Sequence, residues 1–274
     1  MAAIQPGRYR HFKGGEYEVL TTARHSETGE ELVIYRALDE QGTVWARPAS
    51  MWNERVERDG VAIKRFVPLG GMELSLREER PPDYRTVENL TREAFWNVYK
   101  PGCDEHLALH LLRDHPDFLP ALSIVAEKDG RIVGHIAYSR ARIVTDKGEV
   151  RSAICFGPIS VLPECHGQGI GSRLIWYTLA MAKLQGHRAV VILGEPEYYR
   201  RFGFRPASEW GIAMKNGVSI AQLMAIELAP GALAGLRGGR FRETEVFAVD
   251  ERELEAFDRN FPPKVKERTA TQIF

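Results

Sequence analysis

The chain has 274 residues, of which 44% are hydrophobic and 27% charged, a balance typical of folded proteins rather than disordered ones. Lys plus Arg and Asp plus Glu are equal at 37 each, so no net charge would concentrate nucleic acid or an anionic membrane around the chain. No run reaches the roughly 18 consecutive apolar residues of a membrane span, the N-terminus lacks a secretory signal, and the cysteines are scattered. We therefore expect a cytoplasmic protein with no nucleic-acid partner and no membrane.

Residues 1–69 are predicted to form a small all-β domain, because short runs of strand-like residues alternate with turns and no window has a helical period. Its aromatic residues Tyr9, Phe12, Trp45 and Trp52 are expected to form mainly a core. The segment His25-Ser26-Glu27 contains the residue types of a catalytic triad, but adjacent residues cannot face one another as a triad requires. We interpret it as a turn.

Residues 70–82 are predicted to be a linker, since two glycines open the segment, a charged run follows and Pro81-Pro82 stiffens its end. From residue 83 to residue 274, alternating helical and strand patterns predict a mixed α/β domain. Helices are expected over 91–99, 104–113 and 170–184, and strands over 122–126, 132–143, 151–161, 189–193 and 222–228.

A C-terminal extension, 229–274, continues past the last of these strands. Phe241, Phe257 and Phe261 are among several residues that make it too apolar for a disordered tail. We expect it to pack back on the domain, with a short helix over 251–259.

The segment from Ser160 to Ser172 carries the clearest chemical signal. Three glycines alternate with other residues between a predicted strand and a predicted helix. Glycine lets the backbone approach a ligand closely, and the first amides of the helix point outward beside the positive end of its dipole. Such a turn binds a diphosphate. Neither NAD nor ATP fits well, because antiparallel strands precede the turn and the Walker lysine is absent.

Two motifs at the expected separation resemble the GNAT acetyltransferases over about residues 83–228. The first is Val161-x-Pro163 followed by His166-Gly167-Gln168-Gly169-Ile170-Gly171, in which His166 stands where that family usually has Gln or Arg. The second is Tyr199-x-x-x-Gly203-Phe204. The resemblance implies an α/β (α+β) GNAT fold, a mixed twisted sheet with splayed central strands flanked by helices. Residues 7–68 are also similar, nearly end to end, to a short bacterial domain of unknown function.

The resemblance further implies acetyl-CoA as cosubstrate and direct attack by a primary amine. Tyr199 matches the general acid that protonates the departing thiolate, a role that a phenol with a pKa near ~10 can fill. Glu149 and Glu164 are the candidates for the general base, and the sequence does not choose between them. The expected cofactor-binding residues are Ile159, Ser160, Val161, His166, Gly167, Gln168, Gly169, Ile170, Gly171 and Ser172.

Several alternatives stay open at this point. A non-catalytic acyl-CoA-binding sensor or scaffold would carry the same turn, and the acceptor could be a small amine, an amino acid, an antibiotic or a protein lysine. A homodimer is the default assembly. His106 and His110 have the spacing of zinc ligands on a helix, but no second ligand pair follows, so we expect no metal and a solvated or substrate-facing pair. Cys155 is expected to be a small buried residue.

Overall fold

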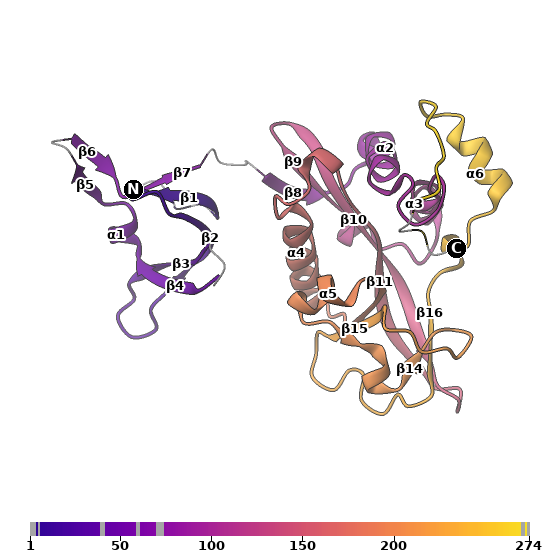
Figure 1. Cartoon of the computed structure of the whole chain (residues 1–274). Coiled ribbons are helices and arrows are strands. Elements are labelled where there is room, and N and C mark those ends of the chain that lie inside the picture. The colour runs from indigo at the N-terminus through magenta and orange to yellow at the C-terminus, as the bar shows by residue number, and fades with distance from the viewer. Residues whose placement is uncertain are drawn as a thin grey trace. The chain divides into compact units, whose positions relative to one another are not determined.

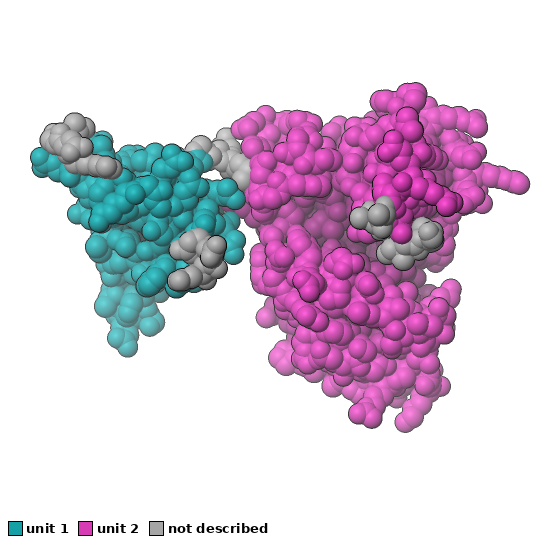
Figure 2. Space-filling model, in the orientation of Figure 1, with its two compact units in different colours: residues 1–73 teal, residues 74–274 magenta. Residues whose placement is uncertain are grey.

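The computed structural model describes residues 4, 6–38, 42–58, 61–69, 74–269 and 272 (Figure 1). Its chain divides into two compact units, Met1–Glu73 and Leu74–Phe274, coloured separately in Figure 2. We call them the N-terminal unit and the C-terminal unit and describe each by itself. No helix in the described ranges is both long enough and apolar enough to cross a membrane.

The N-terminal unit is built on a five-stranded antiparallel sheet of order β4-β3-β2-β1-β7, with a separate β5–β6 hairpin and one short helix. The elements are β1 (Gly7–His11), β2 (Glu16–Arg24), β3 (Glu31–Ala37), β4 (Val44–Pro48), α1 (Ala49–Trp52), β5 (Arg55–Arg58), β6 (Val61–Lys64) and β7 (Phe66–Pro68). The small all-β architecture predicted from the alternating runs is therefore confirmed.

Aromatic rings form the core of this unit. Trp52 is buried and stacks on Phe66 with the ring centroids 3.8 Å apart, and Tyr9 meets Trp52 edge-on at 5.3 Å. The prediction that the aromatic residues form a core holds for Trp52 and is wrong for Trp45, which is 53% exposed on strand β4. Trp45 is paired with the core residue Tyr35, but strand β4 lies at the edge of the sheet, where no further strand covers its flank.

The segment from His25 to Gly29 is a turn between β2 and β3, as the sequence analysis expected. His25 Nδ1 accepts hydrogen bonds from the backbone amides of Glu27 and Thr28, both at 3.3 Å. Gly29 follows in the left-handed region with φ +69°. The imidazole thus organises its own turn and faces no triad partner.

The C-terminal unit contains a nine-stranded mixed sheet whose main path is β13-β15-β12-β11-β10-β16-β14. Strand β9 pairs with the first half of β10, whose last residues pair with β16, and β8 pairs with β9. The strands are β8 (Leu74–Glu78), β9 (Ile124–Lys128), β10 (Arg131–Val144), β11 (Val150–Val161), β12 (Ala189–Leu193), β13 (Arg205–Pro206), β14 (Ile212–Ala213), β15 (Leu223–Glu227) and β16 (Gly239–Arg242).

Helices cover both faces of this sheet, with α4 and α5 on one face and α2 and α3 on the other (Figure 1). They are α2 (Tyr84–Phe95), α3 (Glu105–Asp114), α4 (Ile170–Leu184), α5 (Pro196–Tyr199) and α6 (Glu251–Asp258). The helix predicted over 91–99 was misplaced: α2 ends at Phe95 because Trp96 leaves the helical region and Asn97 has φ +60°. The other predicted helices and the central strands agree closely with the structure.

Strand β8 corrects the linker predicted over 70–82. Leu74 and Leu76 alternate with polar residues and pack against the core, while Arg77 pairs with Asp83 at 2.6 Å and with Glu127 of β9 at 2.9 Å. The charged run that suggested a linker therefore supplies the ion pairs of an edge strand. Residues 70–73, the rest of the predicted linker, lie outside the described residues.

Glu79, directly after β8, belongs to a buried polar network. Its carboxylate accepts from Arg113 of α3 at 2.7 Å and from Ser123 Oγ at 2.9 Å, and it lies 3.6 Å from His135 of β10. Burial alone would raise the pKa of Glu79, but the hydrogen bonds and charges of His135 and Arg113 hold it at about 2. The segment before α2 is thus tied to α3 and to the central sheet.

The C-terminal extension packs on α2 and α3, as the sequence predicted. Arg92 of α2, 1% exposed, binds Asp258 of α6 at 2.7 Å, and Trp96 Nε1 donates to the carbonyl of Val265 at 2.9 Å. Phe257 and Phe261 lie against His106 of α3. Figure 1 shows α6 and the segment after it running beside α3.

Two truncations test the corrected boundary. A chain that begins at Leu74 should keep the thermal midpoint of the C-terminal unit in the full chain, because β8 and Glu79 are retained. A chain that begins at Asp83 should lose about 3 kcal/mol or more, since it lacks β8 and the Glu79 carboxylate, which leaves His135 buried without that partner and Arg113 with Glu88 alone. Its midpoint should fall by roughly 6–12 °C in circular dichroism melts. Equal midpoints for the two truncations would show that residues 74–82 are a linker after all.

Candidate functional site

The two central parallel strands of the C-terminal unit diverge. Among their described residues, β11 and β12 share a single register pair, Ile154 with Val190. Strand β11 continues to Val161 while still paired with β10 on its other side, as far as Val161 with Gly134. The last residues of β11 therefore have one backbone edge directed to the gap that β12 leaves.

Side chains alternate along this free end of β11. Ile159 and Val161 are half-buried, whereas Ser160 is 1% exposed and donates from its Oγ to Thr91 Oγ1 of α2 at 3.1 Å. The strand end is thus anchored on the side of α2, Ile159 and Val161 pack against the core on the other face, and the free backbone edge is left for a ligand. These are three of the residues that the sequence predicted to bind the cofactor.

The glycine-rich turn follows immediately and leads into α4. Gly167 and Gly169 have φ of +73° and +77°, a region that only glycine adopts freely, and a side chain at either would meet nothing within 4 Å. Gly169 is the N-cap of α4, and no described side chain caps this end. The first amides of α4 are therefore open, which gives an anion site at the positive end of the helix dipole.

His166, the departure from the family pattern, is exposed and points back at the strand. Its Nε2 donates to the carbonyl of Val161 at 3.0 Å. The imidazole therefore fixes the turn to the free end of β11 and leaves the amides of Gly167 to Ser172 available. The polar side chain of His166 therefore stabilises the turn through this hydrogen bond to the strand that precedes it.

Gln168 links the turn to a cation that the sequence analysis missed. Its Oε1 accepts from Lys128 Nζ at 3.1 Å, and its Nε2 donates to the carbonyl of Glu164 at 3.2 Å. Lys128 is the last residue of β9, so its charge lies beside the turn although it comes forty residues earlier in the chain. Only the pairing of β9 with β10 reveals this neighbour.

Tyr199 lies between Gly194, directly after β12, and Phe156 in the middle of β11. Strand β12 ends at Leu193, and the ring of Tyr199 covers Gly194 so closely that a Cβ there would lie 2.1 Å from it. On the other side the ring centroid is 5.8 Å from that of Phe156 on β11. Tyr199 is 8% exposed, and burial raises the pKa of its phenol, which therefore stays protonated at neutral pH.

Tyr198 approaches the start of α4. A Cβ at Gly171 would lie 3.1 Å from Tyr198 Oη and 3.7 Å from Val161 Cγ2. Glycine at this position lets α5 and the end of β11 close on the first turn of α4. The two sequence motifs, 160–172 and 199–204, therefore meet in one place.

Neither of the two predicted base candidates lies beside Tyr199. Glu149 precedes the opposite end of β11, roughly 35 Å from Ser160 at the usual rise of a strand. Glu164 lies on the glycine-rich turn, where it pairs with Arg131 at 2.8 Å. Hydrogen bonding to the backbone and to Arg131 lowers the pKa of Glu164, which makes it a weak proton acceptor. Glu149 lies just before β11, where the sequence analysis placed it.

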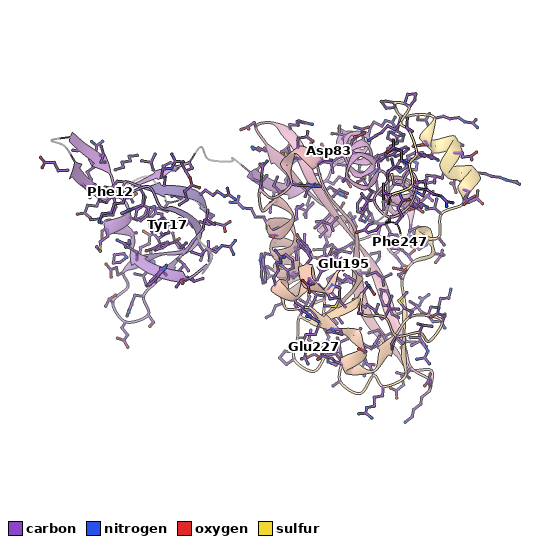
Figure 3. All side chains as sticks on the ribbon, in the orientation of Figure 1. Phe12, Tyr17, Asp83, Glu195, Glu227 and Phe247 are labelled. Atoms are coloured by element: carbon purple, nitrogen blue, oxygen red, sulfur yellow. The ribbon has the colours of Figure 1, made fainter. Side chains whose placement is uncertain are left out.

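Three acidic or phenolic groups that the sequence analysis did not single out lie beside the ends of α2, α3 and α5. Tyr99 follows α2, Glu105 begins α3, and Glu195 lies between β12 and α5 (labelled in Figure 3). Partial burial raises the pKa of Tyr99, and the charges of Glu105 and Glu195 raise it further. Tyr99 in turn contributes to the raised pKa of Tyr199. Tyr99 therefore lies within electrostatic range of Glu105, Glu195 and Tyr199.

The expectation of a solvated pair is wrong for His106 and holds for His110, which is exposed. His106 is 0% exposed and lies 3.3 Å from Asp258, while His110 binds Glu88 at 2.9 Å. The C-terminal extension, which buries His106, could not be foreseen from the helix alone. Among the described residues no group of three or more His, Cys, Asp or Glu could hold a metal ion. Cys155 is buried as predicted, and burial raises the pKa of its thiol.

Two family models match the chain. Residues 120–206 match the model described as "Acetyltransferase (GNAT) domain", and residues 7–68 match "Protein of unknown function (DUF1653)". The first match covers the diverging strands, the glycine-rich turn and Tyr199. The second covers the sheet of the N-terminal unit.

Individual relatives are similar to the C-terminal unit. The chain is 42% identical over 119 residues to the uncharacterized N-acetyltransferase YjhQ of Escherichia coli. These residues are 43% of this chain and 64% of YjhQ, so the chain spans less than two thirds of that relative. Two solved structures each match 65% of this chain. One is the GNAT family N-acetyltransferase YhbS of E. coli in complex with CoA, 28% identical, with 94% of it covered and a TM-score of 0.57. The other is a GNAT family acetyltransferase from Brucella melitensis in complex with acetyl-CoA, 31% identical, with 99% covered and a TM-score of 0.52.

A matched pair of glycine substitutions tests the turn as a diphosphate site. Gly169→Asp places a carboxylate beside the open amides of α4 and should weaken binding of CoA at least about tenfold, because two negative charges would share the site. Gly186→Asp places the same charge at the other end of α4, at a glycine with a similar φ of +83° and equally open space. The second variant should bind like the wild type in isothermal calorimetry. Equal weakening by both variants would exclude the turn as the specific site.

Proposed function

Because the chain belongs to the GNAT family of acetyltransferases, we propose that it is an N-acetyltransferase that moves an acetyl group from acetyl-CoA to a primary amine. The observation that carries the proposal is the divergence of β11 and β12, with an open amide turn at one end and a buried phenol between the strands. Acetyl-CoA supplies the acetyl group in activated form, as a thioester. The residues around the gap are suited to bind acetyl-CoA and to protonate the thiolate that leaves.

The fit to such a cosubstrate rests on the backbone. The open amides from Gly167 to Ser172 would bind the diphosphate, and the nearby charge of Lys128 would add to their field. The free edge of Ile159 to Val161 would pair with the amide groups of the pantetheine arm as a further strand does. No described side chain fills the space next to Gly167 or Gly169.

Tyr199 would act as the general acid. The leaving thiolate needs one proton, and a phenol kept protonated by burial holds that proton on Oη, with its ring between Gly194 and β11. The backbone amides at the end of β11 would stabilise negative charge on the carbonyl oxygen under attack. Cys155 takes no part, because its thiol is buried and its raised pKa keeps it from becoming a nucleophile.

A non-catalytic acyl-CoA-binding module is the second candidate. The packing of Gly194 against Tyr199 favours the enzyme, since a binder would need no phenol in the gap. The acceptor stays unassigned among small amines, amino acids, antibiotics and protein lysines. The three described cysteines are free and buried, which suits a reducing compartment such as the cytoplasm.

Replacement of one hydroxyl separates the two candidates. Tyr199→Phe should lower kcat about 10²-fold with acetyl-CoA and a responsive amine from a panel of primary amines, because the thiolate would leave without its proton donor. Release of CoA thiol is the measurement, and the affinity for acetyl-CoA should stay close to that of the wild type. Tyr177→Phe, on the outer face of α4, is the matched control and should leave kcat unchanged.

The contradicting results differ for each candidate. Tight binding of acetyl-CoA by the wild type without thiol release for any amine would favour the binding module. Turnover that Tyr199→Phe leaves intact would keep the enzyme but remove Tyr199 as its acid.

A further inference from the structure

The sheet of the N-terminal unit has one face that is lined by aromatic residues. Tyr9 of β1 is paired with Tyr17 of β2, and residues paired across antiparallel strands share a face. Tyr35 of β3 is paired with Trp45 of β4 in the same way, and its ring centroid lies 5.6 Å from that of Tyr17 (labelled in Figure 3). Arg47 lies two residues after Trp45 on β4, so it has the same orientation. We call the side that these five residues share the aromatic face.

Trp45 is not part of the core beneath this face. Trp52 and Phe66 stack on each other, and Tyr35 packs on Trp52 with the ring centroids 4.9 Å apart. The Trp45 indole is 53% exposed, and the described part of the chain places no other aromatic ring against it. An exposed indole on a paired strand can bind a flat ring, because stacking needs only a π-face.

Cationic side chains lie around His11 at the same face. The His11 ring centroid is 4.8 Å from that of Phe66, and the guanidinium carbon of Arg47 lies 5.7 Å from the Phe66 centroid. On the other side of His11 the ring of Phe12 lies 4.4 Å away, and Lys13 Nζ is 5.7 Å from the centroid of Phe12. These contacts place an imidazole and two cations around one pair of phenyl rings.

Arg47 and Lys13 have no anionic partner. No carboxylate in the described part of the chain lies within ion-pair distance of either side chain. Arg65, the third cation near His11, pairs with Glu54 at 2.8 Å. Burial lowers the pKa of the His11 imidazole, and the charges of these three cations lower it further. The surroundings of His11 therefore carry a surplus of positive charge.

Arg47 differs from arginines on the opposite face of the sheet. There Arg10 pairs with Glu16 at 2.8 Å, and Arg36 donates to Glu18 at 2.7 Å. Both of these arginines are exposed, whereas Arg47 is half-buried. A charge that is partly removed from water is normally compensated by a partner. The half-buried guanidinium therefore lacks the anion that the exposed arginines have.

The Arg47 side chain is oriented to bind such an anion. Its Nε donates to Tyr35 Oη at 3.2 Å, which fixes the guanidinium and leaves its two terminal nitrogens. A guanidinium group held in this way can bind two oxygens of one phosphate. Trp45 and Arg47 are two residues apart on one strand, about 7 Å at the usual rise. The sugar of a nucleotide provides a separation of this kind between base and phosphate.

We propose that the aromatic face binds a nucleoside phosphate, with the phosphate on Arg47 and the base on Trp45. Lys13 and Arg65 add to the positive field that attracts the phosphate. One exposed indole and one unpaired guanidinium suit a single nucleotide rather than a nucleic-acid strand, which stacks successive bases. The inference goes beyond the proposed acetyl transfer and does not depend on it, since every residue belongs to the N-terminal unit.

The test is NMR of the full chain with CoA in excess, so that a nucleotide does not compete for the turn before α4. The probes are uridine monophosphate, uridine and inorganic phosphate. Uridine monophosphate should move the indole N–H signal of Trp45, which is the signal missing from Trp45→Phe. It should bind at least about tenfold more tightly than uridine or inorganic phosphate, because neither of these makes both contacts.

Three substitutions that each remove one positive charge locate the site. Arg47→Gln should weaken uridine monophosphate at least about tenfold, because the phosphate loses its two hydrogen bonds. Lys13→Gln should weaken it about threefold through the field alone. Lys13 lies in an exposed turn, so we expect this variant to fold. Arg10→Gln removes the same charge from the opposite face and should bind like the wild type.

The ring proton signal missing from His11→Gln gives a second readout. Its titration midpoint should lie below that of a free histidine and rise by at least about half a pH unit when uridine monophosphate binds, because the phosphate offsets the nearby cations. The other titratable groups beside the imidazole are Tyr17, whose ring centroid is 6.3 Å away, and Glu54, which is held by Arg65.

Two results would overturn the proposal. One is a Trp45 signal that does not move at about 10 mM uridine monophosphate. The other is equal weakening by Arg47→Gln and Arg10→Gln, since the affinity would then follow the net charge and not the aromatic face. Failure of CoA to bind would count against the acetyltransferase alone, because these signals come from the N-terminal unit.

Discussion

The separation of β11 from β12 is the constraint on which the site depends. Two parallel strands that stayed paired would satisfy each other's backbone groups and leave no edge for a ligand. Here the register of the two strands comprises Ile154 with Val190, and beyond this pair the strands separate. Strand β11 leads into the glycine-rich turn and α4, whereas β12 leads into Gly194 and Tyr199. The open backbone and the buried phenol are consequences of the same divergence.

The surrounding structure keeps the two strands apart. Tyr199 fills the space between them, and the bond from Ser160 to Thr91 draws the end of β11 toward α2. Behind β10, the buried network of Glu79, Arg113 and His135 ties the chain before α2 to α3. The C-terminal extension then fixes the loop between α2 and α3. Each wall of the gap is thus held by residues that take no part in the chemistry.

Local chemistry could be predicted from the sequence, and long-range burial could not. The glycine-rich turn and the Tyr199 motif are contiguous, so their spacing alone indicated the cofactor end of the site and the phenol. Strand β8 was missed because its partner β9 lies some fifty residues later, and its charges resembled a linker until paired. The burial of His106 was missed because it depends on Asp258, Phe257 and Phe261 of the C-terminal extension, some 150 residues later. Both strands of the β10–β11 hairpin were predicted to within one residue, because their apolar runs and the turn between them are contiguous in the sequence.

The most direct test of the central claim is to map ligand binding on the backbone by amide NMR of the full chain. Addition of CoA should shift the amides of residues 159–161 and 167–172, the free strand edge and the first turn of α4. Pantetheine, which lacks the diphosphate, should shift the first group and leave the second nearly unchanged. This division is the result that our account predicts, because the two segments bind different parts of one ligand. Shifts confined to other parts of the sheet would contradict the account, since the divergence of β11 and β12 would then not form the site.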